Sequence, residues 1–220
     1  MNDRPDDSNS QPDILTPGEL LRKSVLIYGV MAMIGLTVMR FAHNSLASSF
    51  AWPTDLAAGG RLLVIGVVGA GLLLIASYFF EDWFPSYREL KAQVTRLLGP
   101  SSVVTALTLS FITAVGEETL FRGALQPVAG IFVASLLFGI LHMGRDGLLS
   151  AWSLWAFLAG LLLGWMYIAT TSLWPCLIAH FLVNTVSILN LRRTYRNLMT
   201  ISGACVTMRR CGPDHLSEDE

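Results

Sequence analysis

The chain has 220 residues, of which 53% are hydrophobic and only 14% are charged, and its formal net charge is −1. Soluble domains carry roughly 25% charged residues, and a nucleic-acid-binding surface needs an excess of Lys and Arg. The composition therefore excludes a disordered chain, a nucleic-acid binder and most soluble enzymes. The three cysteines have neither the spacing of a zinc site nor that of a disulfide framework. These observations indicate a membrane protein.

Apolar stretches of the length that a bilayer requires, about 20 residues, recur along the chain. The stretch from Gly147 to Leu191 contains no Asp, Glu, Lys or Arg, so a helix there has no charged face to turn toward water. Helices in contact with lipid need no such face. We predict an all-α, polytopic membrane bundle of about six transmembrane helices, near Ser24–Met39, Leu62–Phe80, Ser101–Arg122, Val128–His142, Leu148–Thr170 and Leu173–Leu191.

Three segments lie outside these stretches. Residues 1–15 are rich in Asp, Ser and Pro and are expected to form a disordered N-terminal tail. The segment that follows, Thr16-Pro17-Gly18-Glu19, has the pattern of a helix-capping box. A second such pattern starts at Ser86 and opens Tyr87–Leu98, which is apolar on one face and is predicted to be an interfacial amphipathic helix. Residues 192–220 are expected to form a cytoplasmic C-terminal tail.

The positions of Lys and Arg predict the orientation in the membrane. With six spans, twelve of the 15 Lys and Arg residues fall on the side that carries both termini. Because cytoplasmic loops are enriched in these residues, both termini are expected in the cytoplasm.

Between Pro100 and Arg145 only three residues carry a formal charge, and all three lie in an apolar stretch: Glu117, Glu118 and Arg122. One unpaired charge at the middle of a bilayer costs roughly 2.5–3.5 kcal/mol, so these side chains must be paired or hydrated. Glu118 and Arg122 are four residues apart on one helix face and are expected to form an ion pair. Glu117 is rotated by about 100°, so we expect it to stay free for chemistry.

Two histidines, His142 and His180, lie in the apolar segments. His180 and Asn184 are four residues apart on the last predicted span, so an imidazole and an amide face the same small volume. Phe138 precedes His142 by one helical turn and is expected to pack against its ring. Ionisable residues within membrane segments are candidates for a functional site.

Three short motifs in this region resemble those of the CAAX-protease and bacteriocin-processing family of intramembrane glutamic endopeptidases. Glu117 to Arg122 matches the EExxxR motif, Phe138 to His142 the FxxxH motif, and His180 to Asn184 the HxxxN/D motif. Each motif is weak alone, but the three in order, each on an apolar stretch, make a strong combined signal. We therefore expect a membrane-embedded protease domain at 16–191, with its motif-bearing core at 101–191.

The resemblance implies endopeptidase activity without a metal or another cofactor. Glu117 would act as general base on a water that His142 holds, while His180 and Asn184 would form the oxyanion hole. The implied substrate is a membrane-tethered or hydrophobic peptide, and the compact form suggests a bacterial cytoplasmic membrane. The residues expected to support the site are Glu118, Arg122 and Phe138.

Straight helices would not bring this site together. Glu117 lies toward the outer end of the third predicted span and His142 at the inner end of the fourth, which leaves them more than about 10 Å apart in depth. Convergence requires a tilted, broken or half-length element. The short fourth segment, which contains Gly130 and Gly139 and follows Pro127, is the expected place.

Two other functions stay open at this stage. Two histidines with one or two glutamates could supply a catalytic zinc site, although the chain has no H-E-x-x-H motif. The chain could also be a non-catalytic membrane scaffold or immunity protein with the same fold.

Some residues also have purely structural interpretations. Taken singly, the two histidines and Asn184 suit helix packing. Gly160 and Gly164 form a G-x-x-x-G pattern that permits close helix packing, within the chain or between chains. His43 has no partner in reach by sequence and is expected to be inert.

Overall fold

The computed structural model describes residues 16–143 and 150–210, and these residues form helices and no β-strand. The predicted all-α bundle is therefore confirmed, while the predicted disordered tail, residues 1–15, lies outside the described residues, as do residues 144–149 and 211–220. The elements are α1 (Pro17–Phe41), α2 (Leu46–Phe50), α3 (Leu56–Trp83), α4 (Pro85–Leu98), α5 (Val103–Glu118), the π-helix η1 (Thr119–Leu125), α6 (Gln126–Leu141), α7 (Ala151–Thr170) and α8 (Trp174–Arg210).

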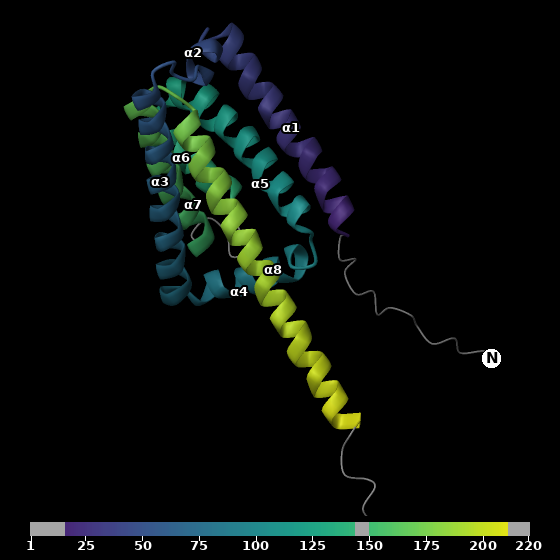
Figure 1. The fold of residues 1–220 in the computed structure, drawn as a ribbon. Helices are drawn as coiled ribbons and strands as arrows, with labels where there is room; N and C mark the ends of the chain where they lie inside the picture. The colour runs from purple at the N-terminus through teal and green to yellow at the C-terminus, as the bar shows by residue number, and fades with distance from the viewer. Residues whose placement is uncertain (1–15, 144–149, 211–220) are drawn as a thin grey trace, which may run out of the picture.

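The long helices run side by side, with α2 at the upper end of the bundle and α4 across its lower end (Figure 1). α1 begins and α8 ends at the lower end. Hydrophobic side chains on the outer faces are widely exposed, for example Leu26, Val64 and Phe132, as expected for contact with lipid. Within the described residues, five stretches are long and apolar enough to cross a membrane, namely Gly18–Phe41, Leu56–Trp83, Val103–Leu141, Ala151–Thr170 and Trp174–Ile201. The chain is an integral membrane protein.

The longest of these stretches reverses direction at Gly130. Val103–Leu141 has 39 residues, or about 58 Å of helix, about twice the hydrocarbon thickness of a bilayer. Gly130 has non-helical dihedral angles (φ 79°, ψ 166°), a conformation that is essentially restricted to glycine. The chain turns back there, since His142 comes within 3.9 Å of Glu117. Of the tilted, broken or half-length forms expected for the fourth segment, the structure shows a broken one.

Two predicted span boundaries are wrong. The third segment does not end at Arg122, because the helix continues through η1 to the break at Gly130. A charged residue usually marks the edge of a span, but Arg122 is buried inside the bundle, with 2% of its surface exposed. The last helix also continues past Leu191 to Arg210, because no Pro or Gly follows until Gly203.

The two predicted capping boxes have different outcomes. Thr16 caps α1 as predicted: its side chain accepts from the Glu19 amide and the Glu19 side chain accepts from the Thr16 amide. The capping box predicted at Ser86 is wrong, because α4 begins at Pro85 and its N-cap, Phe84, makes no side-chain hydrogen bond. Proline is favoured at the first position of a helix because an N–H group there has no hydrogen-bond acceptor within the helix.

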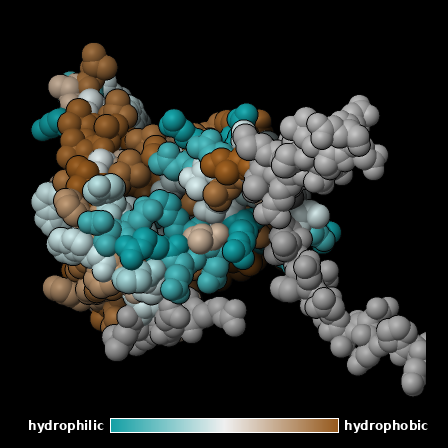
Figure 2. Space-filling view, turned by 90° about the horizontal axis from the view of Figure 1, so that it is seen from below, coloured by the Kyte–Doolittle hydropathy of each residue, from teal (hydrophilic) through white to brown (hydrophobic). Residues whose placement is uncertain are grey.

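α4 has the amphipathic character that a helix on a membrane surface requires. Tyr87 and Thr95 are buried against the bundle, whereas Arg88 and Arg96 are exposed. Figure 2 looks at this lower end and shows hydrophilic residues gathered across its middle, with hydrophobic residues toward its sides.

The G-x-x-x-G pattern of α7 packs within the chain. A Cβ at Gly160 would lie 3.0 Å from Cβ of Ser135, and a Cβ at Gly164 would lie 2.7 Å from Oε1 of Gln126. The carbonyl oxygens of these two glycines accept hydrogen bonds from Arg122 Nη2 (3.3 Å) and Gln126 Nε2 (2.9 Å). The π-helix and the start of α6 are therefore attached directly to the backbone of α7.

Candidate active site

The candidate site is centred on Glu117 and Glu118, at the junction of α5 with η1. Their exposed fractions are 5% and 0%. Gly116 lets α1 approach this junction, because a Cβ there would lie 2.7 Å from the carbonyl oxygen of Tyr28. π-Helical segments occur frequently at functional sites. Both carboxylates thus lie inside the bundle, where an uncompensated charge is costly.

Arg122 compensates Glu118. Its Nη1 lies 3.2 Å from Oε1 of Glu118, and its Nη2 donates to the carbonyl oxygen of Gly160. The guanidinium carbon also lies 4.6 Å from the centroid of the Phe138 ring, within the range of a cation–π contact. The ion pair predicted from the four-residue spacing is confirmed.

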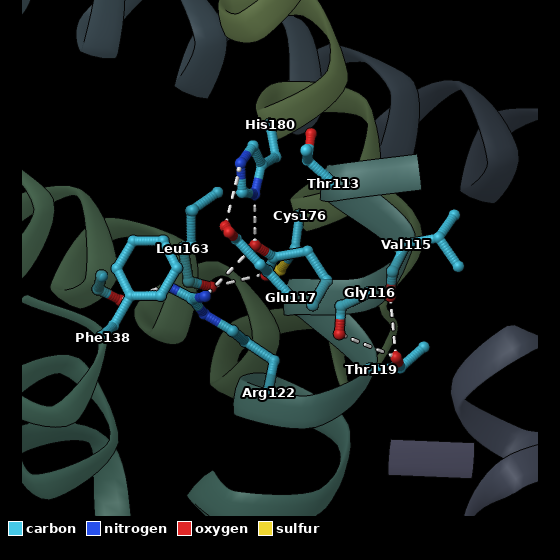
Figure 3. Close-up of polar contacts among 12 residues, drawn as sticks. Thr113, Val115, Gly116, Glu117, Thr119, Arg122, Phe138, Leu163, Cys176 and His180 are labelled. Carbon is cyan, nitrogen blue, oxygen red and sulfur yellow. Dashed lines mark hydrogen bonds and ion pairs between the residues drawn. The ribbon is translucent and has the colours of Figure 1, made fainter. Parts of the chain in front are cut away.

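His180 contacts both carboxylates, and Figure 3 shows its ring pointing toward Glu117. Its Nδ1 lies 2.7 Å from Oε1 of Glu118, and its Nε2 lies 3.4 Å from Oε2 of Glu117. Because Glu118 also accepts from Arg122, the Nδ1 atom of His180 carries the hydrogen of this contact and Nε2 is the atom that faces Glu117.

His142 approaches Glu117 from the end of α6. Its Nδ1 lies 2.8 Å from the carbonyl oxygen of Phe138, so this nitrogen donates and Nε2 is free to accept. Nε2 lies 3.9 Å from Oε1 of Glu117. The ring centroids of His142 and Phe138 are 4.4 Å apart, so the predicted packing of Phe138 against this imidazole is present.

The chain reversal explains how these residues reach the same depth. Glu117 precedes Gly130 by about 20 Å of helix, and His142 follows it by about 18 Å. The two arms are nearly equal in length, so both side chains come to the same level of the bundle.

Asn184 lies one turn further along α8 than His180. Its Nδ2 donates to Oγ1 of Thr113 on α5 (2.9 Å). The described contacts do not include one between Asn184 and Glu117. The structure thus brings Glu117, Glu118, Arg122, Phe138, His142 and His180 into one cluster, with Asn184 at its edge; the catalytic roles of these residues stay predictions.

Comparison with known proteins gives the family. A family model described as type II CAAX prenyl endopeptidase Rce1-like matches residues 99–186. The uncharacterized protein YpbD of Bacillus subtilis (strain 168) is 33% identical over 129 residues, which are 57% of this chain and 67% of YpbD. The chain belongs to the Rce1-like family. No solved structure is significantly similar to it. The matched residues contain the whole cluster described above, so family membership and geometry point to the same part of this Rce1-like chain.

The charges of the cluster in this Rce1-like protein determine which chemistry it can perform. The cluster contains two carboxylates and one guanidinium, so it is neutral when one further proton is held by Glu117, His142 or His180. The Oε2 atoms of Glu117 and Glu118 make no hydrogen bond within the described residues. A carboxylate with two imidazole nitrogens 3.4 and 3.9 Å away supplies the groups that general acid–base chemistry requires.

The described part of the chain has no arrangement of side chains that favours metal binding. Within residues 16–143 and 150–210, no group of three or more His, Cys, Asp or Glu side chains is placed to hold a metal ion. The zinc alternative is therefore left to a direct test.

Three contacts around the site were not predicted from the sequence. Thr113 and Gln126 are each four residues from a predicted site residue, Glu117 and Arg122, so a search along the same helix face would have found these two residues but not their partners on other helices. His43, expected to be inert, lies with Nε2 2.9 Å from the carbonyl oxygen of Ala124. No local pattern links residues so distant in sequence.

Proposed function

We propose that the chain is an intramembrane endopeptidase that hydrolyses a peptide bond of a membrane-tethered or hydrophobic peptide, with Glu117 as the general base. The observation that carries this proposal is the Glu117 carboxylate, buried in a membrane bundle with an imidazole nitrogen on either side. Membership of the Rce1-like family supports the reaction class.

The gap between Glu117 and His142 suits a catalytic water. Its 3.9 Å length is too long for a direct hydrogen bond and is of the size that one bridging water spans. Both facing atoms are acceptors, so the water donates one hydrogen to each and directs a lone pair toward a peptide carbonyl carbon. As the water attacks, Glu117 takes its proton.

The remaining groups stabilise the tetrahedral intermediate. The amide of Asn184 has a second N–H beyond the one given to Thr113, and His180 can donate from Nε2 when both ring nitrogens carry a proton. Such donors stabilise a developing oxyanion by a few kcal/mol each. When the C–N bond breaks, Glu117 returns its proton to the leaving amine, so that one water has been added across the peptide bond.

The bundle also supports a proposed orientation. α1 begins and α8 ends at the lower end, where α4 lies (Figure 1). Exposed cations gather on the segments at this end: Arg22, Lys23, Arg88, Arg96, Arg193 and Arg196. By the positive-inside rule we place this end, and both termini, in the cytoplasm of a bacterial cell.

The decisive experiment compares wild type with Glu117→Gln, which keeps the shape of the side chain and removes its basicity. Membrane peptides of cells that carry each version are compared by mass spectrometry. We expect a longer precursor to accumulate only in the variant. Glu89→Gln, an exposed change on α4, is the matched control and should give the wild-type profile.

Unchanged peptide profiles in Glu117→Gln cells would refute the endopeptidase proposal and favour the non-catalytic scaffold. Comparable levels of both proteins in the membrane fraction are required, because a loss of folding would imitate a loss of activity.

A further inference from the structure

α5 and α8 meet in a regular antiparallel seam at the site. Glu117 of α5 faces His180 of α8 across 3.4 Å. One turn back along α5, Thr113 faces Asn184, which lies one turn forward along α8. Four residues of helix rise about 6 Å along the axis, so the two pairs lie at successive levels of one seam. Thr113 therefore belongs to the same surface as the proposed base.

The hydroxyl of Thr113 can only accept from Asn184. Its own hydrogen is directed at the carbonyl oxygen of Ser110, 3.1 Å away within α5. A lone pair of Oγ1 is left to accept from Nδ2 of Asn184 at 2.9 Å. This contact determines which end of the amide faces α5, because the carbonyl end of an amide cannot donate.

We propose that Thr113 is a positioning residue for the site: it holds the Asn184 amide so that its second N–H meets the oxyanion formed during peptide hydrolysis. This inference rests on the proposed function. Asn184 lies four residues from His180 on α8, so the two proposed oxyanion donors share one helix face. Thr113 lies outside the three motifs that support the family resemblance.

Replacement of Thr113 by Val tests the hydroxyl, because Val has the same shape without it. The assay is the cleavage rate, in lipid vesicles, of the precursor that accumulates in Glu117→Gln cells. We expect Thr113→Val to lower the rate about tenfold, as for the loss of one hydrogen bond to the transition state. Thr113→Ser keeps the hydroxyl and should restore the rate to within about twofold of wild type.

Thr95→Val is the matched control. Thr95 is buried in α4, and its hydroxyl donates only to the carbonyl oxygen of Lys91 in its own helix. This variant should cleave at the wild-type rate. Thermal unfolding midpoints of all variants, measured in the same detergent, separate misfolding from a loss of positioning.

A double-mutant cycle with Asn184→Ala identifies the route by which Thr113 acts. If Thr113 acts through Asn184, then Thr113→Val changes the rate by less than about twofold once Asn184 has been removed. Independent, multiplying losses would overturn the proposal, as would a wild-type rate in Thr113→Val alone. If Glu117→Gln cells accumulate no precursor, the proposed function itself fails, and the role of Thr113 fails with it.

Discussion

The ion pair between Arg122 and Glu118 offers a sharp test of how the buried charges are balanced. The two side chains are 2% and 0% exposed, so water cannot replace a lost partner. Removal of one partner from a buried pair costs about 3–5 kcal/mol, because the other charge is left uncompensated. For a chain of this size, each kcal/mol lowers the unfolding midpoint by about 2–4 °C. Arg122→Met should therefore lower it by about 6–20 °C.

The assay is thermal unfolding in detergent, followed by tryptophan fluorescence. A second variant, Arg122→Met with Glu118→Gln, removes both charges and should unfold at a higher temperature than Arg122→Met alone. Lys91→Met is the matched control, because its ion pair with Glu81 is more than a third exposed and such pairs are worth about 0–1 kcal/mol. If Arg122→Met lowers the unfolding midpoint no more than Lys91→Met does, the reasoning is refuted.

Two further predictions concern the chain reversal and the chemistry. Gly130→Ala should destabilise the protein by about 1–3 kcal/mol, because the φ of 79° at this position is unsuited to a side chain, although no atom lies within 4 Å of a Cβ there. Gly29→Ala is the control, since Gly29 is equally open but helical, and it should not destabilise the protein in this way. Equal unfolding midpoints for the two variants would contradict the backbone argument. Cleavage of the precursor should continue in the presence of a strong chelator. If the chelator abolishes cleavage and added zinc restores it, the zinc hydrolase is favoured over the Glu117 mechanism.

Local patterns in the sequence were sufficient for the parts of the site that lie on one helix. The Glu118–Arg122 pair and the contact of Phe138 with His142 follow from a four-residue spacing, and both are present. The broken element was also predictable, because straight helices would keep Glu117 and His142 at different depths and the short fourth segment contains Gly130.

Contacts between helices could not be derived in this way. The hydrogen bond from Asn184 to Thr113 joins residues 71 positions apart, and its existence depends on how α5 and α8 are rotated against each other. Arg122 was predicted to end a span because a charge in an apolar stretch normally meets water. Only the folded bundle shows that a carboxylate, a carbonyl oxygen and an aromatic ring surround it.

The attachment of η1 to α7 has a consequence for evolution within the family. Arg122 and Gln126 end on carbonyl oxygens of Gly160 and Gly164, so their partner is main chain, which every amino acid possesses. Substitutions on the two sides need not compensate each other chemically; selection at the α7 positions acts on bulk alone. Chemical covariation between the two sides would therefore not reveal this junction, although it anchors the segment that carries the charge-balancing arginine.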